Sequence, residues 1–224
     1  MADRNSNTCV QLHEQYRPKS WGEVVGQDKA LAKIEQLRRR GLGGRAYWIT
    51  GQSGTGKTTI ARLIATDIAD DWCIEEVDAE QLTPGRVTEL ERLSATRGMG
   101  RGGRAFIVNE AHGLKKATIR QLLVSLEGDR VPSHVAWLFT TTVDGQDNLF
   151  ADCDDSHPLL SRCAIIGLAR RDLCEPFAAR CREIAQAEGL DGQPHERYVK
   201  LMKKCGNNLR AALQAVEAGE MIAD

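Results

Sequence analysis

The sequence has few aromatic residues, no long apolar run and almost no net charge. Phe, Trp and Tyr make up 5% of the 224 residues, which favours an α/β protein over an all-β protein. No segment approaches the roughly 18–20 apolar residues of a membrane-spanning helix, and the polar N-terminus lacks the apolar segment of a signal peptide. We therefore expect a cytoplasmic protein without membrane contact. Because the net charge is −1, any nucleic-acid contact would need a local basic patch.

The seven cysteines do not have the spacing of a metal site. No two of them form a Cys-x-x-Cys pair, so the sequence predicts no structural zinc. Thiols are normally reduced in the cytoplasm, and we interpret most of these as small buried apolar residues.

Short apolar runs alternate with amphipathic segments over the first 168 residues. The runs predict strands at residues 46–50, 72–77, 105–108, 135–139 and 164–166. The segments between them predict helices at residues 28–40, 57–69, 84–96 and 115–127. This alternation predicts an α/β fold with a mostly parallel five-stranded sheet. Three helical segments without a strand follow, so we expect a core over residues 1–168 and a small all-helical domain over residues 169–224.

A glycine-rich segment directly follows the first predicted strand. It matches the phosphate-binding pattern GxxxxGK[ST] over Gly51, Gln52, Ser53, Gly54, Thr55, Gly56, Lys57 and Thr58. The glycines let backbone N–H groups surround phosphates, Lys57 offers a cation to the β- and γ-phosphates, and the Thr58 hydroxyl can bind Mg²⁺. The helix that begins with Lys57, Thr58 and Thr59 turns its positive end toward the same anion. The sequence therefore predicts ATP and Mg²⁺ as ligands.

An acidic residue ends the third predicted strand. Glu110 could orient or deprotonate an attacking water. Asn109 precedes it, where phosphate-binding-loop proteins usually have Asp. An amide can hydrogen-bond a metal-bound water but carries no negative charge. Three consequences stay open: weaker Mg²⁺ binding, slower hydrolysis, or compensation by another acid. His112 is interpreted as a surface residue at the strand end.

In this order, the motifs resemble those of the AAA+ ATPase subunits of DNA sliding-clamp loaders, of the replication factor C small-subunit and bacterial DNA polymerase III gamma/tau type. The resemblance extends from about Tyr16 to Val216. Its motifs are residues 14–21 (EQYRPKSW), 23–27 (EVVGQ), the phosphate-binding loop as Walker A, 109–112 (NEAH) as Walker B, 139–142 (FTTT), 159–163 (LLSRC) and 205–210 (CGNNLR).

The resemblance implies roles for residues outside the phosphate-binding loop. Residues that would surround the adenine are Tyr16, Arg17, Pro18 and Val25. Thr142 would be the sensor 1 residue beside the γ-phosphate. Arg162 would be an arginine finger that reaches the ATP of a neighbouring subunit. Arg210 would be the sensor 2 arginine of a helical lid, with ATP between the lid and the core.

The resemblance also implies partners. We expect a homo- or hetero-oligomer, specifically a pentamer, that opens a sliding clamp and loads it onto primer–template DNA during replication. The family's helical collar is not expected here. Lys115, Lys116 and Arg120 begin a helix that lines the DNA channel in that family, and Arg101 lies in a glycine-rich basic loop. An ordinary solvated surface explains these four charges about equally well.

Two other functions stay open. One is another AAA+ DNA remodeller or a helicase loader, which would bind branched DNA or a helicase in place of a ring clamp. The other is a non-hydrolysing ATP-binding scaffold, which the amide of Asn109 favours.

Overall fold

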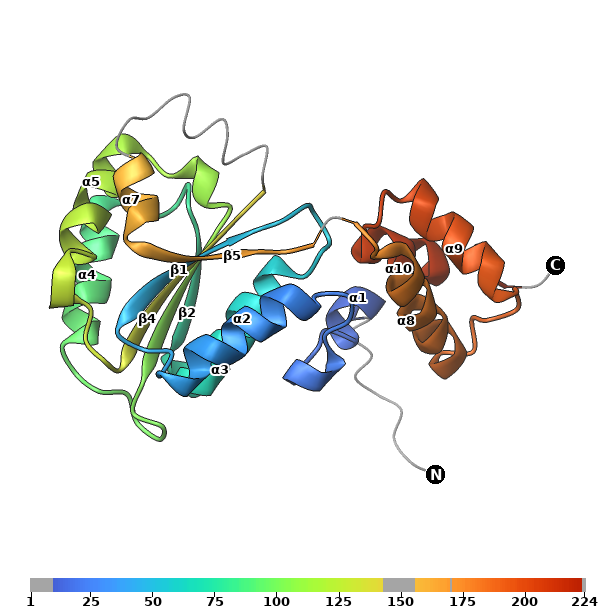
Figure 1. Cartoon of the computed structure of the whole chain (residues 1–224), viewed down its shortest axis with the longest axis horizontal. Coiled ribbons are helices and arrows are strands. Elements are labelled where there is room, and N and C mark those ends of the chain that lie inside the picture. The colour runs from blue at the N-terminus through green and yellow to red at the C-terminus, as the bar shows by residue number, and fades with distance from the viewer. Residues whose placement is uncertain (1–9, 143–155, 170, 223–224) are drawn as a thin grey trace. The chain divides into compact units, whose positions relative to one another are not determined.

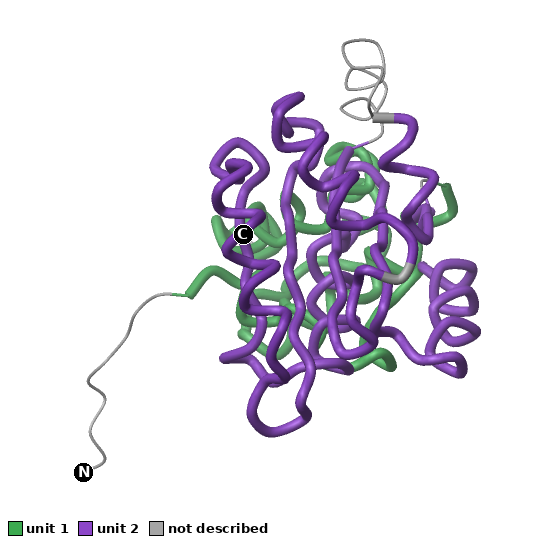
Figure 2. Tube along the Cα trace, turned by 90° about the vertical axis from the view of Figure 1, so that its left-hand side faces the viewer, with its two compact units in different colours: residues 1–26, 170–224 green, residues 27–169 purple. Residues whose placement is uncertain are grey.

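The chain divides into two compact units in the computed structural model, which describes residues 10–142, 156–169 and 171–222. Residues 27–169 form one, which we call the core unit, and residues 1–26 with 170–224 form the other, the helical unit (Figure 2).

Five parallel strands form the sheet of the core unit (Figure 1). They are β1 (Arg45–Thr50), β2 (Ile74–Asp78), β3 (Arg104–Asn109), β4 (Val135–Thr141) and β5 (Cys163–Gly167), in the order β2-β3-β4-β1-β5. Because every neighbouring pair is parallel, all carboxyl ends meet at one edge, which we call the carboxyl edge; the other is the amino edge. The prediction of a five-stranded parallel sheet is confirmed.

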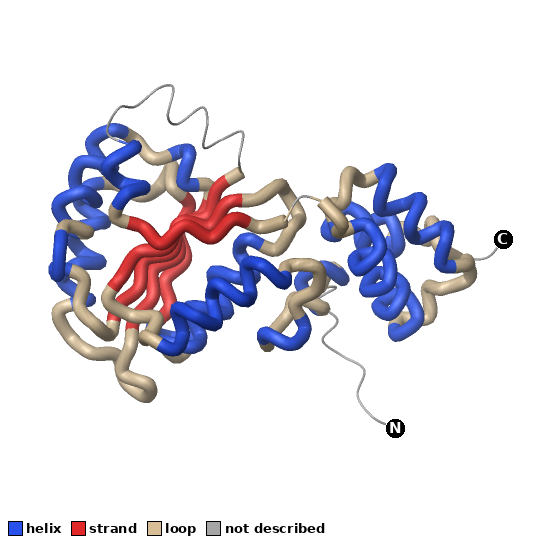
Figure 3. Tube along the Cα trace, viewed as in Figure 1, coloured by secondary structure: helices blue, strands red, loops and turns tan. Residues whose placement is uncertain are grey.

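Helices cover both faces of this sheet (Figure 3). The helices on one face are α2 (Asp28–Arg39) and α3 (Lys57–Ile68), and those on the other are α4 (Pro84–Ser94), α5 (Lys116–Ser125) and α7 (Ser156–Ser161). The strands are therefore buried on both sides, which explains why β1, β3 and β4 have apolar runs without alternation. Pro84 opens α4 as predicted, and the Thr83 hydroxyl caps it by accepting the Arg86 N–H at 3.2 Å.

Aromatic side chains gather in the layer between the sheet and helices α4, α5 and α7. Trp48, Phe106, Trp137 and Phe139 are all buried there. Ring centroids are 4.7 Å apart for Phe106 and Trp137, and 5.7 Å apart for Trp48 and Phe139. Such pairs add about 0.5–1.5 kcal/mol beyond the burial of apolar area. These four side chains thus hold three adjacent strands, β3, β4 and β1, together.

The helical unit consists of α1 (Leu12–Gln15), α8 (Cys174–Ala187), α9 (His195–Lys204) and α10 (Leu209–Glu217). Tyr198 of α9 is buried and donates its hydroxyl to Asp191 at 3.0 Å. The Leu12 N–H of α1 donates to Glu217 of α10 at 3.2 Å, across 205 residues of sequence. None of the helices in the described ranges is long and apolar enough to cross a membrane.

Four short 3₁₀ turns complete the described elements: η1 (Trp21–Glu23), η2 (Asp71–Cys73), η3 (Ala111–Gly113) and η4 (Gly128–Arg130). The turn η2 corrects one prediction, because Trp72 and Cys73 were expected to begin the second strand. The Cys73 N–H instead donates to the Asp70 carbonyl at 2.7 Å, which closes a turn and leaves Trp72 72% exposed.

The division into units differs from the expected domains at the N-terminus. The core unit ends at Ala169, one residue past the predicted boundary, but residues 1–26 belong to the helical unit and not to the core. The physical reason is the packing of α1 on α10, which pairs the two ends of the chain.

Candidate active site

The phosphate-binding loop lies at the carboxyl edge, between β1 and α3. A Cβ on Gly51 would lie 2.8 Å from the Thr55 Oγ1 and 2.9 Å from the Leu168 Cβ, so the close turn requires glycine. Gly56 has a φ of 97° directly before α3, and no heavy atom lies within 4 Å of the position of a Cβ there. Lys57 is 8% exposed and donates its Nζ to the Gln52 carbonyl at 2.9 Å. The loop is therefore folded on itself, with its lysine held at its centre.

The side chain of Gln27 supports this loop through a hydrogen bond, a role that the sequence did not predict. Its side chain is 2% exposed. The Nε2 donates to the Thr55 carbonyl at 3.4 Å, and the Oε1 accepts the Ala169 N–H at 2.7 Å. One buried amide thus joins the loop to the last residue of the core unit. The sequence signal that could have indicated this role is the position of Gln27 at the end of the segment EVVGQ.

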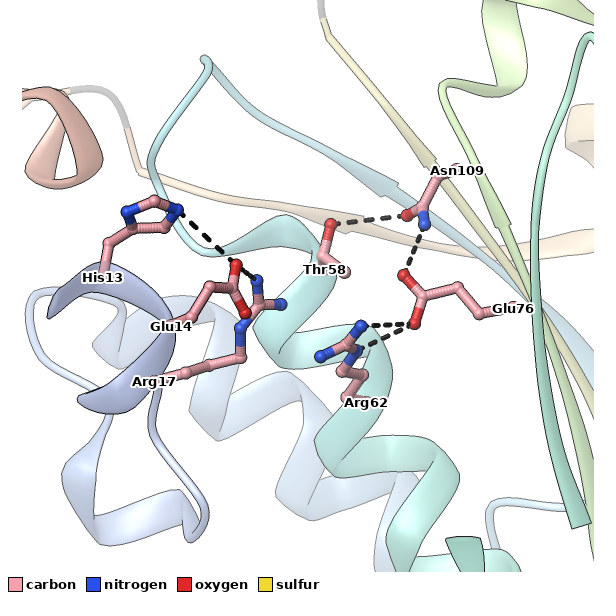
Figure 4. Close-up of polar contacts among 7 residues, drawn as sticks. All are labelled: His13, Glu14, Arg17, Thr58, Arg62, Glu76 and Asn109. Atoms are coloured by element: carbon pink, nitrogen blue, oxygen red, sulfur yellow. Dashed lines mark hydrogen bonds and ion pairs between the residues drawn. The ribbon is translucent and has the colours of Figure 1, made fainter. Parts of the chain in front are cut away.

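Asn109, at the end of β3, is the centre of a polar network at the carboxyl edge (Figure 4). Its Oδ1 accepts hydrogen bonds from the hydroxyls of Thr58 at 3.3 Å and Thr140 at 2.9 Å. Its Nδ2 donates to the Glu76 carboxylate at 2.6 Å. Glu76, on β2, also forms an ion pair with Arg62 of α3 at 2.7 Å. The predicted metal-binding pair, Thr58 and Asn109, therefore lies in direct contact.

Glu110 follows Asn109 in a left-handed conformation, with φ 49° and ψ 50°. A non-glycine residue in this region stores strain and is often found at functional sites. Its carboxylate lies 3.5 Å from the Nδ1 of His112, and the same nitrogen lies 3.2 Å from the hydroxyl of Thr141 at the end of β4. His112 thus connects the ends of β3 and β4. Its interpretation as a surface residue at the strand end did not include these contacts.

Thr142 directly follows β4 and is half-buried. The carbonyl of the preceding Thr141 accepts the Gly51 N–H at 3.4 Å, which ties the end of β4 to the start of the phosphate-binding loop. The expected sensor 1 residue is therefore next to this loop in the fold.

Arg162 lies at the amino edge of the sheet. It follows α7 and directly precedes β5, where Cys163 pairs with Ala46 near the start of β1. The phosphate-binding loop begins after Thr50, roughly 13 Å farther along β1 at about 3.3 Å per residue. Arg162 donates its Nη1 to the Pro158 carbonyl at 2.9 Å and is half-exposed. Arg162 thus lies at the opposite edge of the sheet from its own chain's phosphate-binding loop. Burial raises the pKa of the neighbouring Cys163 to about 12, so that thiol stays protonated.

The residues expected around adenine, and the expected sensor 2 arginine, belong to the helical unit. Tyr16 donates its hydroxyl to Glu188 at 2.7 Å, and Arg17 forms an ion pair with Glu14. Pro18 and Val25 are half-buried, and Arg210 is exposed on the first turn of α10. Their roles toward a nucleotide stay predictions.

The basic residues proposed to contact DNA do not form one patch. Lys115 and Lys116 are exposed at the start of α5, just after the carboxyl edge, and Arg120 is exposed farther along that helix. Arg101 instead precedes β3 at the amino edge, where it donates to the Thr66 carbonyl at 2.6 Å and lies 3.7 Å from Asp70. It lines a cavity of about 750 Å³ that is separate from the phosphate-binding loop.

Comparisons with known proteins agree with the motifs. The chain is 28% identical to DNA polymerase III subunit tau of Salmonella typhimurium over 237 residues, 93% of this chain and 35% of that protein. It is 29% identical to the replication factor C large subunit of Methanosarcina mazei over 127 residues, 54% of this chain and 20% of that protein. No protein-family model matches.

Among solved structures, the RuvB Holliday junction branch migration motor of Thermotoga maritima has a TM-score of 0.70 at 22% identity, over 90% of this chain and 64% of that chain. The sequence matches confirm the resemblance to the DNA polymerase III and replication factor C subunits, and the structural match confirms the AAA+ fold. The chain spans about a third or less of the length of these curated relatives.

Proposed function

We propose that the chain is a clamp-loader-like ATPase subunit, which binds and hydrolyses ATP at subunit interfaces to open a sliding clamp and load it onto primer–template DNA. The observation that carries this proposal is the position of the catalytic groups. Lys57, Asn109, Glu110 and Thr142 converge on the carboxyl edge, whereas Arg162 is at the amino edge. One chain therefore has most of a phosphoryl-transfer site and lacks its arginine.

The residues at the carboxyl edge fit a nucleotide and its metal ion. Gly56 leaves open space beside the start of α3, where helix N–H groups attract phosphate. Lys57 supplies the cation, Thr58 offers a hydroxyl oxygen to Mg²⁺, and Asn109 offers an amide oxygen to a metal-bound water. When bound, Mg²⁺ would neutralise charge on the β- and γ-phosphates.

Each residue then has a distinct task. Lys57 would exchange its bond to the Gln52 carbonyl for one to phosphate oxygens. Glu110 would orient the attacking water and accept its proton, with His112 and the strained backbone fixing the direction of its carboxylate. Thr142 would hydrogen-bond the γ-phosphate or the same water. These groups position and polarise, which is most of what phosphoryl transfer requires of a protein.

Arg162 would complete the site of a neighbouring chain. Its place at the opposite edge of the sheet from its own loop supports a contact in trans. A guanidinium beside a γ-phosphate is worth about 10³–10⁵ in rate. Isolated chains should therefore hydrolyse ATP slowly, and association should accelerate hydrolysis. The names of the relatives, subunits of DNA polymerase III and replication factor C, support a task in DNA replication.

The test is steady-state ATP hydrolysis at several protein concentrations, with and without primer–template DNA. Turnover per chain should rise with concentration and with DNA, and Arg162→Ala should abolish the rise. Arg92→Ala, which removes an exposed arginine of α4, is the matched control.

Mixing two inactive variants tests the shared site directly. Lys57→Ala lacks the lysine of its phosphate-binding loop but keeps Arg162, and Arg162→Ala lacks the arginine finger but keeps Lys57. In a mixture, some interfaces therefore pair an intact Lys57 with an intact Arg162. Restored turnover in the mixture supports the proposal. Background turnover in the mixture and in the unmodified chain, with ATP still bound, contradicts it and favours a non-hydrolysing scaffold.

A second candidate function is a DNA remodeller that acts on branched DNA. It is favoured by the fold match to a branch migration motor. ATPase stimulation by primer–template DNA with a ring clamp, compared with stimulation by a four-way junction, separates the two. A preference for the junction would replace the clamp-loading proposal.

A further inference from the structure

Asn109 stands where an aspartate is usual, and the structure shows what surrounds this amide. Four residues from three elements form a continuous hydrogen-bonded series: Thr58 and Arg62 of α3, Asn109 of β3 and Glu76 of β2 (Figure 4). Thr58 and Arg62 are four residues apart and so lie on the same face of α3. Glu76 is on β2, the edge strand beside β3, and its side chain is 28% exposed.

The chemistry of the partners fixes which way the amide of Asn109 points. A carboxylate only accepts hydrogen bonds, so the NH₂ group of Asn109 has to face Glu76, at 2.6 Å. The Oδ1 is then directed to the opposite side, where the hydroxyls of Thr58 and Thr140 donate to it. A reversed amide would place its NH₂ group beside Thr58 and would oppose a cation there.

Both oxygen atoms of Glu76 are in use. The Oε2 accepts from the Nε of Arg62 at 2.8 Å and from its Nη2 at 2.7 Å, while the Oε1 accepts from Asn109. A carboxylate offers a separate oxygen atom to each of the two neighbours. A glutamine at this position has one carbonyl oxygen, which the charged Arg62 would take, and its NH₂ group would then face the NH₂ group of Asn109.

We propose that Glu76 is the positioning residue that makes Asn109 an oxygen donor toward the metal ion of the nucleotide. The Glu76–Asn109 pair does the work of a single aspartate: the amide contributes the oxygen atom, and the carboxylate behind it contributes the negative charge and the orientation. This inference rests on the proposed function, because the metal ion is the one bound with ATP.

The pair predicts reciprocal rescue. Glu76→Gln places two donors against each other, and Asn109→Asp places two carboxylates against each other. The double variant restores the hydrogen bonds and moves the negative charge from position 76 to position 109. Arg62 donates to the carbonyl of the introduced glutamine, and the NH₂ group of that glutamine donates to the introduced aspartate. The aspartate still accepts from Thr58. Each single change should therefore lower the melting temperature of the ligand-free protein, and the double variant should melt close to the unmodified chain.

Binding of a fluorescent ATP analogue, measured by anisotropy against Mg²⁺ concentration, gives the functional readout. Glu76→Gln should raise the Mg²⁺ concentration required by about tenfold, as for other residues that orient metal ligands. Affinity in EDTA should not change, and adding Asn109→Asp should restore the Mg²⁺ requirement. Glu75→Gln is the matched control, since Glu75 is on the same strand and pairs with Arg86.

The outcomes separate this inference from the proposed function. If Glu76→Gln lost equal nucleotide affinity in EDTA and in Mg²⁺, Glu76 would have a general structural role and the inference would be overturned. The inference would also be overturned if the decreases in melting temperature of the two single variants added up in the double variant. If the unmodified chain binds the analogue with Mg²⁺ and Glu76→Gln behaves as Glu75→Gln does, only the assignment of Glu76 fails. If the unmodified chain shows no binding that depends on Mg²⁺, the proposed function fails with it.

Discussion

Gln27→Met should destabilise the core unit, although methionine has nearly the same size. The buried amide of Gln27 satisfies two backbone groups, the Ala169 N–H at 2.7 Å and the Thr55 carbonyl at 3.4 Å. An unsatisfied buried group costs about 1–3 kcal/mol. Loss of the short bond to the Ala169 N–H should carry most of this cost. Loss of the long bond to the Thr55 carbonyl should add less, because that oxygen has a second lone pair. We therefore expect a total loss of about 2 kcal/mol in the free energy of unfolding. A shift of roughly 4–8 °C in melting temperature follows for a chain of this size.

Thermal unfolding followed by tryptophan fluorescence measures this effect, because Trp48 and Trp137 are buried in the core unit. Gln36→Met is the control, since Gln36 is exposed on α2, and its shift should stay below about 2 °C. ATP affinity should also fall in Gln27→Met, because the loop loses its support. Equal melting temperatures for the two variants would refute the view that this buried amide holds the loop and Ala169 together.

Three further predictions concern the site, the helical unit and the core. Glu110→Gln should keep ATP affinity and lose at least about 10²-fold in turnover, measured by filter binding beside a phosphate-release assay. The pKa of Asp191 is raised by burial but lowered more by hydrogen bonds from Gln186, Tyr198 and Arg182, so its net shift is downward from 3.8. Asp191 therefore stabilises the helical unit above about pH 4 and loses this effect as the pH falls through its folded pKa. Circular dichroism should show that loss in the unmodified chain, and Asp191→Asn should be less stable at pH 7 and depend less on pH. Phe139→Ala should cost about 3–5 kcal/mol in a urea titration, because its ring is fully buried.

The sequence predicted those parts of the fold and site that depend on neighbouring residues. Pro84 marks a helix start by local chemistry, and α4 begins there. The phosphate-binding loop follows from the spacing of its glycines and lysine between a strand and a helix. Trp72 shows the limit of such patterns, because an apolar residue just before a strand can equally belong to a turn and be exposed to solvent.

The contacts that the sequence did not reveal join residues that are far apart along the chain. Glu76 and Asn109 meet because β2 and β3 are neighbours, and strand order cannot be derived from the spacing of residues within each strand. Gln27 and Ala169 are 142 residues apart, and α1 joins α10 across 205. Arg62 lies four residues after Thr58 on the same face of α3, and its ion pair with Glu76 became evident only in three dimensions.

The placement of Arg162 and the phosphate-binding loop at opposite edges of one sheet has a consequence for symmetry. A twofold dimer brings the same surface of both partners together, whereas the proposed contact would join two different surfaces of the chain. Chains joined through them stack head to tail in one direction. Such a row has one fewer complete site than it has chains unless it closes into a ring. The first chain would offer a finger without a substrate and the last a nucleotide without a finger, so an open assembly of identical chains would have two chemically different ends.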